Sequence, residues 1–301
     1  MKNFYFYLAL AAFTLTLAAC GDKGNNPETI ITPPEGAING LFTVDAQGTQ
    51  VYFSKGNLQA TTSDKGNSWT WSFATNQWDF IGNQVANTTI KSNGKVSTNG
   101  TVDLFVWSCY KNYYGIHNSQ NTGDYNGPCE DWGNNPISNG GNEPKLWRTL
   151  TNDEWVYLLQ TREDAANKYG AAKVNDIPGV VFLPDEWTLP SGLEFTPGRI
   201  KGAAQYDWSK VDSKNIYDIN QWHAMEKNGA VFLPATGFRY GTEVHYVESV
   251  GYYWSSTLRI YGKPGKWYLF AFISPNDILP NQCNDSYPYG QSVRLVQNLK
   301  K

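Results

Sequence analysis

The residues best suited to binding a ligand lie near the end of the chain, between Thr257 and Tyr289. In this stretch, aromatic side chains alternate with amides and carboxylates among glycines and prolines. Flat aromatic rings stack on sugar faces and anchor protein interfaces, while Asn and Asp supply hydrogen bonds. We therefore expect a ligand-binding site that comprises Tyr261, Trp267, Asn276, Asp277, Asn284, Asp285, Tyr287 and Tyr289. The alternative is that some of these rings only hold loops in place.

Residues that commonly carry out catalysis do not form a comparable set. His117, His223 and His245 are far apart in the sequence. His223 and Glu226 are three residues apart on an expected helix and could share an ion, but a solvated helix face explains them more simply. The chain lacks a Gly-x-Ser-x-Gly elbow, a phosphate-binding loop and an HExxH sequence. We therefore expect a protein that is not an enzyme, with no catalytic residue, metal or cofactor.

Two pairs of charged residues each allow two interpretations. Asp153 and Glu154 are adjacent, so they diverge on a helix, and both lie in its first turn, where the helix dipole favours anions. Helix capping explains them better than acid–base chemistry. Arg148 and Arg294 could hold an anionic ligand, or they could pair with carboxylates at the edge of the core, which we favour.

The four cysteines divide into Cys20 near the N-terminus and three further along the chain, Cys109, Cys129 and Cys283. An odd number in the exported part leaves at least one unpaired. A disulfide between Cys109 and Cys129 would close a short loop if the compartment is oxidising. In a reducing compartment all three would be buried thiols, and the sequence leaves both states open.

Cys20 ends the stretch LTLAAC, which follows Lys2 and an apolar run. That run is too short to cross a bilayer comfortably and has the character of a secretory signal. The small residues before Cys20 resemble the lipobox of bacterial lipoproteins, in which the cysteine becomes the lipidated first residue. We expect residues 1–19 to be a lipoprotein signal peptide and Cys20 to carry the membrane anchor. The alternative is an ordinary signal peptide that happens to contain a cysteine.

The remainder of the chain predicts a flexible stalk and one domain. Residues 20–38 contain Gly, Asn and Pro but no aromatic residue, which is typical of a flexible linker. Residues 39–298 show no break in composition and predict a single domain. The 24 basic and 27 acidic residues nearly balance and form no Lys/Arg cluster, so nucleic acid is not an expected partner. Charged residues are scarce, at 17%, whereas tryptophan occurs twelve times, which indicates long loops held by large side chains.

The patterning predicts many short strands. Alternating apolar and polar residues around a glycine-containing turn predict a hairpin over residues 40–59. Trp69, Trp71 and Phe73 fall on one face at period two. Residues 82–100 are polar and predict an exposed loop. Further strands are expected at 102–110, 179–187, 229–237, 252–257, 267–273 and 292–296, of which 179–187 and 229–237 are similar to each other and predict neighbours in one sheet.

Two helices are expected. In the first, Thr151 is the N-cap and Glu154 completes a capping box, and the buried face consists of Trp155, Leu158 and Leu159. In the second, Asp218 is the N-cap and Gly229 ends the helix, and the residues that face inward are Trp222 and Met225.

The first helix resembles the Arg-Leu-Pro-Thr-x-x-Glu-Trp-Glu-Tyr segment of the formylglycine-generating-enzyme and sulfatase-modifying-factor superfamily. The matching residues are Arg148, Thr151, Glu154, Trp155, Tyr157 and Arg162. Segments 231–239, 251–257 and 290–296 resemble, in the same order, segments of the related Fibrobacter paralogous-domain family. The resemblance spans about residues 145–297. It implies an α+β, C-type-lectin-like fold with mixed or antiparallel sheets, two helices and long irregular loops.

Two departures from these families affect the chemistry that the resemblance implies. Active formylglycine-generating enzymes bind copper through a cysteine pair near the C-terminus, where this chain has only Cys283. In Asn142-Glu143-Pro144-Lys145, a lysine occupies the position of a calcium ligand in sugar-binding lectins, and its charge would repel the ion. We therefore expect neither that catalysis nor calcium-dependent sugar binding at this motif.

These expectations combine into a lipid-anchored protein of the cell envelope, at the outer membrane or cell surface. It would bind a glycan or a surface protein through its C-terminal loops, without catalysis. One alternative is an enzyme of the formylglycine-generating type with a rearranged site, and another is a structural subunit of a surface appendage or uptake complex. Aromatic residues with Asn and Asp suit a sugar and a protein equally well.

Overall fold

The computed structural model describes residues 32–109, 113–261, 265–284 and 288–300. The chain from Thr32 to Lys301 forms one compact unit. Residues 32–38, which the sequence assigns to the stalk, pack onto this unit: Ala37 forms a bridge with Ser54, and the Ile38 N–H donates to the Phe53 carbonyl at 2.9 Å. The expected signal peptide, Cys20 and stalk residues 21–31 lie outside the described residues. Within the described ranges, no helix is both long and apolar enough to cross a membrane.

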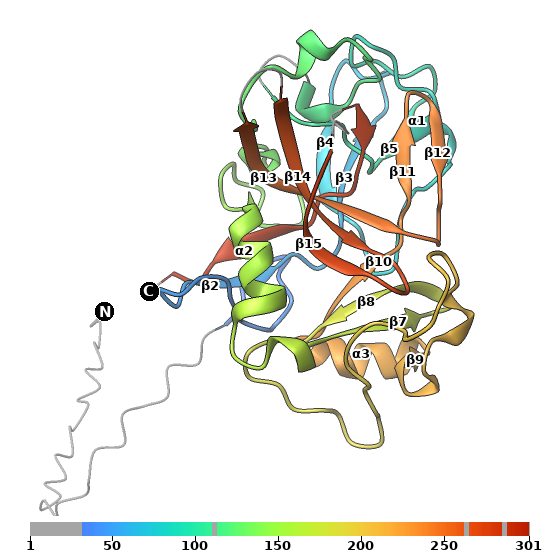
Figure 1. Cartoon of the computed structure of the whole chain (residues 1–301). Coiled ribbons are helices and arrows are strands. Elements are labelled where there is room, and N and C mark those ends of the chain that lie inside the picture. Colours follow the sequence, from blue (N-terminus) through green and yellow to red (C-terminus); the bar gives the residue numbers. More distant parts are fainter. Residues whose placement is uncertain (1–31, 110–112, 262–264, 285–287, 301) are drawn as a thin grey trace, which may run out of the picture. The chain divides into compact units, whose positions relative to one another are not determined.

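The fold is α+β, with mostly antiparallel sheets (Figure 1). The first four-stranded sheet has the order β1-β2-β17-β6, with strands Phe42–Thr43, Gln50–Phe53, Leu295–Asn298 and Arg148–Thr149. The second has the order β10-β8-β7-β9, with strands Val231–Pro234, Ile177–Phe182, Tyr169–Val174 and Ile216–Tyr217. The similar segments of the sequence are β8 and β10, which pair antiparallel as neighbours, so that prediction is confirmed.

Three further sheets have three strands each. In the order β4-β3-β5, the strands are Thr70–Phe73, Leu58–Thr62 and Gly100–Val102. In the order β12-β11-β16, they are Glu243–His245, Phe238–Tyr240 and Tyr289–Gly290. In the order β13-β14-β15, they are Gly251–Tyr261, Gly265–Ile273 and Ile278–Asn284. The expected hairpin over residues 40–59 is β1–β2, and the expected strands 252–257 and 267–273 lie within β13 and β14.

The described residues contain three α-helices, α1 (Val85–Thr88), α2 (Asn152–Val156) and α3 (Ile219–Lys227). A wider helical turn, Tyr157–Thr161, continues α2. The expected capping box at Thr151 with Glu154 is present, and so is the expected N-cap Asp218, which also forms a capping box with Gln221 that the sequence analysis did not predict. Short 3₁₀ turns lie at Tyr113–Gly115, Thr122–Tyr125, Trp132–Asn134, Ala165–Asn167, Trp208–Lys210 and Ser213–Asn215.

Two segments differ from the sequence prediction. Residues 82–100, expected as an exposed loop, contain α1 and bury Ala86, Ile90 and Val96 in the core. These three apolar side chains are few and widely spaced in a polar segment, so the average composition predicted an exposed loop although each of them packs inward. Residues 103–109, expected as a buried strand, are buried but contribute only the isolated bridges of Phe105 and Cys109.

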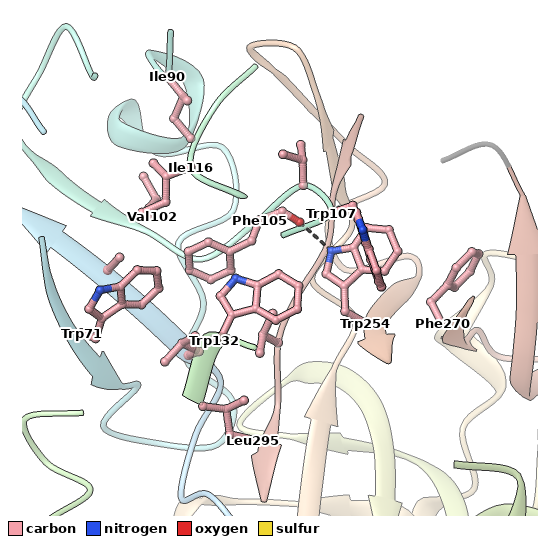
Figure 2. Packing of buried hydrophobic residues seen from close by; sticks show 14 of the residues in the cluster. Trp71, Ile90, Val102, Phe105, Trp107, Ile116, Trp132, Trp254, Phe270 and Leu295 are labelled. Atoms are coloured by element: carbon pink, nitrogen blue, oxygen red, sulfur yellow. Dashed lines mark hydrogen bonds between the residues drawn. The ribbon is translucent and has the colours of Figure 1, made fainter. Parts of the chain in front are cut away.

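The centre of one hydrophobic cluster is aromatic. Figure 2 shows Trp71, Phe105, Trp107, Trp132 and Trp254 packed together, with the Trp254 indole N–H directed at the Phe105 carbonyl. That hydrogen bond is 2.7 Å long, and the rings of Trp107 and Trp254 meet edge to face with centroids 5.5 Å apart. The indoles of Trp107 and Trp132 also donate to backbone carbonyls, so rings from segments far apart in the sequence hold the irregular loops.

Candidate binding surface

The structure does not bring the eight predicted binding residues together. Tyr261 ends β13, Trp267 pairs with Arg259 near the same end of the sheet, and Asn284 ends β15 beside Tyr268. Asp285 and Tyr287 lie outside the described residues. The Tyr261, Trp267 and Asn284 backbones therefore share one end of the β13-β14-β15 sheet.

Asn276 and Asp277 lie at the opposite end of this sheet, in the turn between β14 and β15. Strand β14 has nine residues and is therefore about 30 Å long. The Asn276 Oδ1 accepts a hydrogen bond from the Ser274 hydroxyl at 2.9 Å, and Asp277 lies 3.3 Å from Arg199 in an exposed ion pair. These two side chains therefore hold a turn and stand far from the other end of the sheet.

Tyr289, on β16, belongs to a different group of aromatic residues. Side chains alternate along a strand, so Phe238 and Tyr240 of β11 share one face and Arg239 points to the other. Cross-strand pairing places His245 opposite Phe238, and it places Tyr289 opposite Tyr240. Directly paired residues lie on the same side of a sheet, so one face of the β12-β11-β16 sheet is aromatic.

Three more tyrosines extend this surface beyond the sheet. We call the combined surface the aromatic face, and it consists of Tyr206, Phe238, Tyr240, His245, Tyr246, Tyr252 and Tyr289. A row of ring contacts runs through it, from Tyr240 to Tyr289 (5.1 Å between centroids), Phe238 (5.0 Å), Tyr246 (5.9 Å) and Tyr206 (4.9 Å). The row is therefore several rings long.

The two ends of this row face solvent, while Phe238 and Tyr289 between them are half-buried. Tyr206, Tyr240 and Tyr246 are 44%, 39% and 49% exposed. Tyr252 is half-buried, and burial raises its pKa to about 12, with further contributions from Tyr206, Tyr246 and Tyr289. Its hydroxyl therefore stays protonated at neutral pH. The nearby tyrosines add further groups that both donate and accept hydrogen bonds beside the rings.

The loop that presents Tyr246 has an unusual backbone. Tyr246 and Glu248 have φ angles of 55° and 57°, in the left-handed region that non-glycine residues rarely adopt. The Glu248 N–H donates to the Ala235 carbonyl at 2.8 Å, and the Ser249 N–H donates to the Tyr246 carbonyl at 3.0 Å. The surrounding structure therefore holds a strained conformation that places an aromatic ring in solvent, a feature common at binding sites.

Gly237 allows this loop to pack closely against β11. Its φ is 73°, and a Cβ atom there would lie 2.2 Å from the His245 carbonyl oxygen. Its N–H donates to the Val250 carbonyl at 2.7 Å. A side chain at position 237 would therefore push apart the two segments that carry the aromatic face.

Arg239 supports the aromatic face from behind. Its guanidinium is fully buried and donates to the carbonyls of Leu104, His117 and Gly241 at 3.1, 3.1 and 2.6 Å. Burial lowers its pKa to about 10, so it stays charged at neutral pH. These hydrogen bonds fix β11 to the backbone at Leu104 and at His117, and they also hold the turn at Gly241.

The charged side chains on the segments that form the aromatic face are mostly acidic. In the segments 206–207 and 238–248, the charged residues other than buried Arg239 are Asp207, Glu243 and Glu248. The Glu243 carboxylate lies 3.5 Å from Nε2 of His245. Lys210 and Lys173 lie close enough to Asp207 to lower its pKa, whereas an anionic ligand would meet repulsion near Glu243 and Glu248.

The arginines singled out in the sequence have structural roles. Arg148 forms a bidentate pair with Glu154, at 2.6 and 2.7 Å, as expected. The prediction that Arg294 pairs with a carboxylate is wrong. Its fully buried guanidinium donates to Gln77, Asn57 and the Phe232 carbonyl. Gln77 in turn donates to Glu226 at 3.0 Å, so an amide stands between the cation and the nearest carboxylate.

The three histidines lie in different surroundings. His117 is buried against Tyr125, His223 is exposed on α3 beside Trp78, and His245 lies on the aromatic face. Glu226 accepts the hydrogen bond from Gln77. In the part of the chain that the structure describes, no group of three or more His, Cys, Asp or Glu side chains could hold a metal ion.

The sequence analysis identified Tyr289 but missed the rest of the aromatic face. The sequence pattern that could have predicted the aromatic face is the stretch FRYGTEVHY, in which Phe238, Tyr240 and His245 lie on one side of a short hairpin around Gly241. The contact of Tyr206 with Tyr246 joins a distant loop and has no local signature.

The aromatic face and its supporting residues give the geometry from which a function can be argued. The chain matches nothing in a scan of protein-family models, a search of curated proteins or a search of solved structures.

Proposed function

We propose that this protein is a non-catalytic binding protein of the cell envelope, held by a lipid on Cys20, and that it binds a glycan on the aromatic face. The observation that carries the proposal is the row of contacting rings whose members Tyr206, Tyr240 and Tyr246 remain 39–49% exposed. A folded chain normally buries such rings, and a contiguous exposed aromatic surface marks an interaction site.

A glycan suits this surface because a sugar has both apolar C–H faces and hydroxyl groups. The flat rings receive the C–H faces, and the tyrosine hydroxyls donate and accept hydrogen bonds at the ring edges. A pyranose is about the size of a phenol ring, so the row accommodates more than one sugar. The acidic side chains of Glu243 and Glu248 favour a neutral glycan over a sulfated or uronic one.

We propose further that the domain has the C-type-lectin-like fold of the sulfatase-modifying-factor superfamily. Support comes from the α+β, largely antiparallel architecture and from α2, whose capping box and Arg148–Glu154 pair use the residues of the motif.

The test is a glycan array probed with the full chain in detergent, alongside a Tyr240→Ala/Tyr246→Ala double variant. The matched control is Tyr113→Ala, because Tyr113 is 53% exposed but lies outside the aromatic face. We expect binding to neutral glycans by the parent and the control, and a loss of at least tenfold in the double variant. Loss in a Trp267→Ala variant alone would move the site to the end of the β13-β14-β15 sheet. No binding by a folded parent would refute the glycan proposal.

The anchor is tested separately from the ligand. A Cys20→Ser variant should fail to incorporate labelled palmitate and should leave the membrane fraction, because one removed cysteine abolishes all the acyl attachment. Retention of both properties would refute lipidation at Cys20.

A further inference from the structure

Cys109 and Cys129 lie directly opposite each other in two short antiparallel segments. The Glu130 N–H donates to the Ser108 carbonyl at 2.9 Å, one residue beyond the cysteine pair on each segment. This hydrogen bond lies beside the two cysteines and does not join them, so Cys109 and Cys129 form a non-hydrogen-bonded pair of the antiparallel ladder. In such pairs the Cα atoms are about 4.5 Å apart and both side chains point to the same side.

This spacing is within the range that a disulfide spans, which is about 4.4–6.8 Å between Cα atoms. We infer that Cys109 and Cys129 are the site of a cross-strand disulfide that forms when the protein is exported. Cys283 is not a competing partner for either, because it is exposed on β15, where it pairs with Leu269. The pairing follows from the register alone and does not depend on the proposed glycan binding.

The oxidation needs an acceptor, and the fitting class is a dithiol–disulfide oxidase of the envelope. The new bond joins Sγ of Cys109 to Sγ of Cys129, and the disulfide of the oxidase breaks. Two electrons and two protons pass from the cysteines to the two sulfurs of the oxidase.

The folded protein is a poor substrate for this exchange. Cys109 is buried and Cys129 is half-buried, and desolvation raises the pKa of the Cys129 thiol well above its usual range, with Asp131 and Cys109 adding to the effect. The thiolate is the attacking species, so the exchange belongs to the folding chain, before the pair is covered. Once formed, the bond is shielded from reductants by the same burial.

The disulfide would fix the loop that supports Arg239. In the thiol state, Cys109 Sγ donates to the Asp124 carbonyl at 3.2 Å, and the Trp107 indole donates to the Gly127 carbonyl at 3.2 Å. The same loop supplies the His117 carbonyl that accepts from Arg239. A covalent link between residues 109 and 129 replaces the weak hydrogen bond from the Cys109 thiol to the Asp124 carbonyl. It also closes a loop of about 20 residues, which constrains the unfolded chain.

The test uses the full chain exported into a bacterial envelope that contains a dithiol oxidase. Denatured protein is alkylated with iodoacetamide without reductant, digested, and examined by mass spectrometry. We expect one linked peptide pair that contains Cys109 and Cys129, and an alkylated Cys283. We also expect dithiothreitol, added during unfolding, to lower Tm by about 5 °C in the parent and in Cys283→Ser, but not in Cys129→Ser.

Alkylation of both Cys109 and Cys129 in the exported protein would overturn the inference, as would a link from either residue to Cys283. The peptide map of the parent decides the question even if Cys129→Ser does not fold. Failure of glycan binding in the array leaves this result unaffected, so the two proposals fail separately.

Discussion

Tryptophans fill the interior of the domain, whereas tyrosines cover the aromatic face. Trp107, Trp132 and Trp254 are fully buried, and each donates its indole N–H to a backbone carbonyl. On the aromatic face, Tyr206 and Tyr246 stack on each other and remain exposed. An indole has one donor, which the chain itself can satisfy, while a phenol at the surface keeps a group for a partner. Under the proposed function, the high aromatic content combines two roles, one in stability and one in binding.

Truncation in the interior should have the largest effect on stability. Trp254→Ala removes a fully buried ring that packs on Trp107 and Phe270, and it removes one of the two hydrogen bonds that the Phe105 carbonyl accepts. We expect a loss of about 3–5 kcal/mol in the free energy of unfolding, measured in urea at pH 7. A loss below about 1 kcal/mol would mean that the ring is not part of the core.

The buried His117 should make the interior sensitive to acid. Burial, with Arg239 nearby, lowers its pKa from 6.5 to about 4. The unfolded chain therefore takes up the proton first, and stability is lost as the pH falls from about 6.5 towards 4. We expect His117→Phe, which keeps a ring against Tyr125, to gain about 3 kcal/mol relative to the parent between pH 7 and pH 4. If the free energies of unfolding of the two proteins changed in parallel with pH, the lowered pKa assigned to His117 would be contradicted.

Asp103 should have the opposite pH dependence. Burial raises its pKa from 3.8 to about 6, despite hydrogen bonds from Asn87 and the Ile81 N–H. The folded state therefore binds the proton first, and the contribution of this group to stability is lost as the pH rises through about 6. Relative to the parent, Asp103→Asn should lose about 2 kcal/mol on going from pH 7 to pH 4, in urea titrations at each pH. A gain instead would show that the carboxylate is stabilised when ionised.

Gly237→Ala tests whether the aromatic face depends on its backbone as well as on its rings. The left-handed φ and the contact with the His245 carbonyl should cost about 1–2 kcal/mol in stability. Glycan binding should fall together with stability because the loop that carries Tyr246 moves. The control is Gly192→Ala, because Gly192 has a similar φ of 81° but open space around it. In this variant, stability should fall while glycan binding is retained.

The smallest stability change is expected on the aromatic face itself. Tyr240→Ala and Tyr246→Ala remove exposed rings, so the free energy of unfolding should change by no more than about 0.5 kcal/mol each. Glycan binding should nevertheless be lost. A stability loss comparable to that of Trp254→Ala would assign these rings to the core and remove the contrast between the two regions.

Local features of the fold were predictable from the sequence. The capping box at Thr151, the N-cap at Asp218 and the buried stripe that includes Trp155 depend on residues a few positions apart. The neighbouring strands β8 and β10 were recognised because their local sequences are similar. The site was predicted less well because it depends on register and on distant loops. Asn276 and Asp277 are close in sequence to Asn284, but a hairpin carries them to the opposite end of a sheet. Tyr206 joins Tyr246 only through tertiary packing.

The position of β17 has a consequence for when the domain can fold. Figure 1 shows the C-terminal strand beside β2, and Val296 pairs with both Phe53 and Arg148, so a strand from the end of the chain lies inside the sheet. During synthesis, β2 and β6 therefore lack their common neighbour until residues 295–298 have left the ribosome. Closing so long a loop is slow. A chain that must cross a membrane in an extended form would benefit from this delay, because its topology postpones the folded state until the last strand arrives.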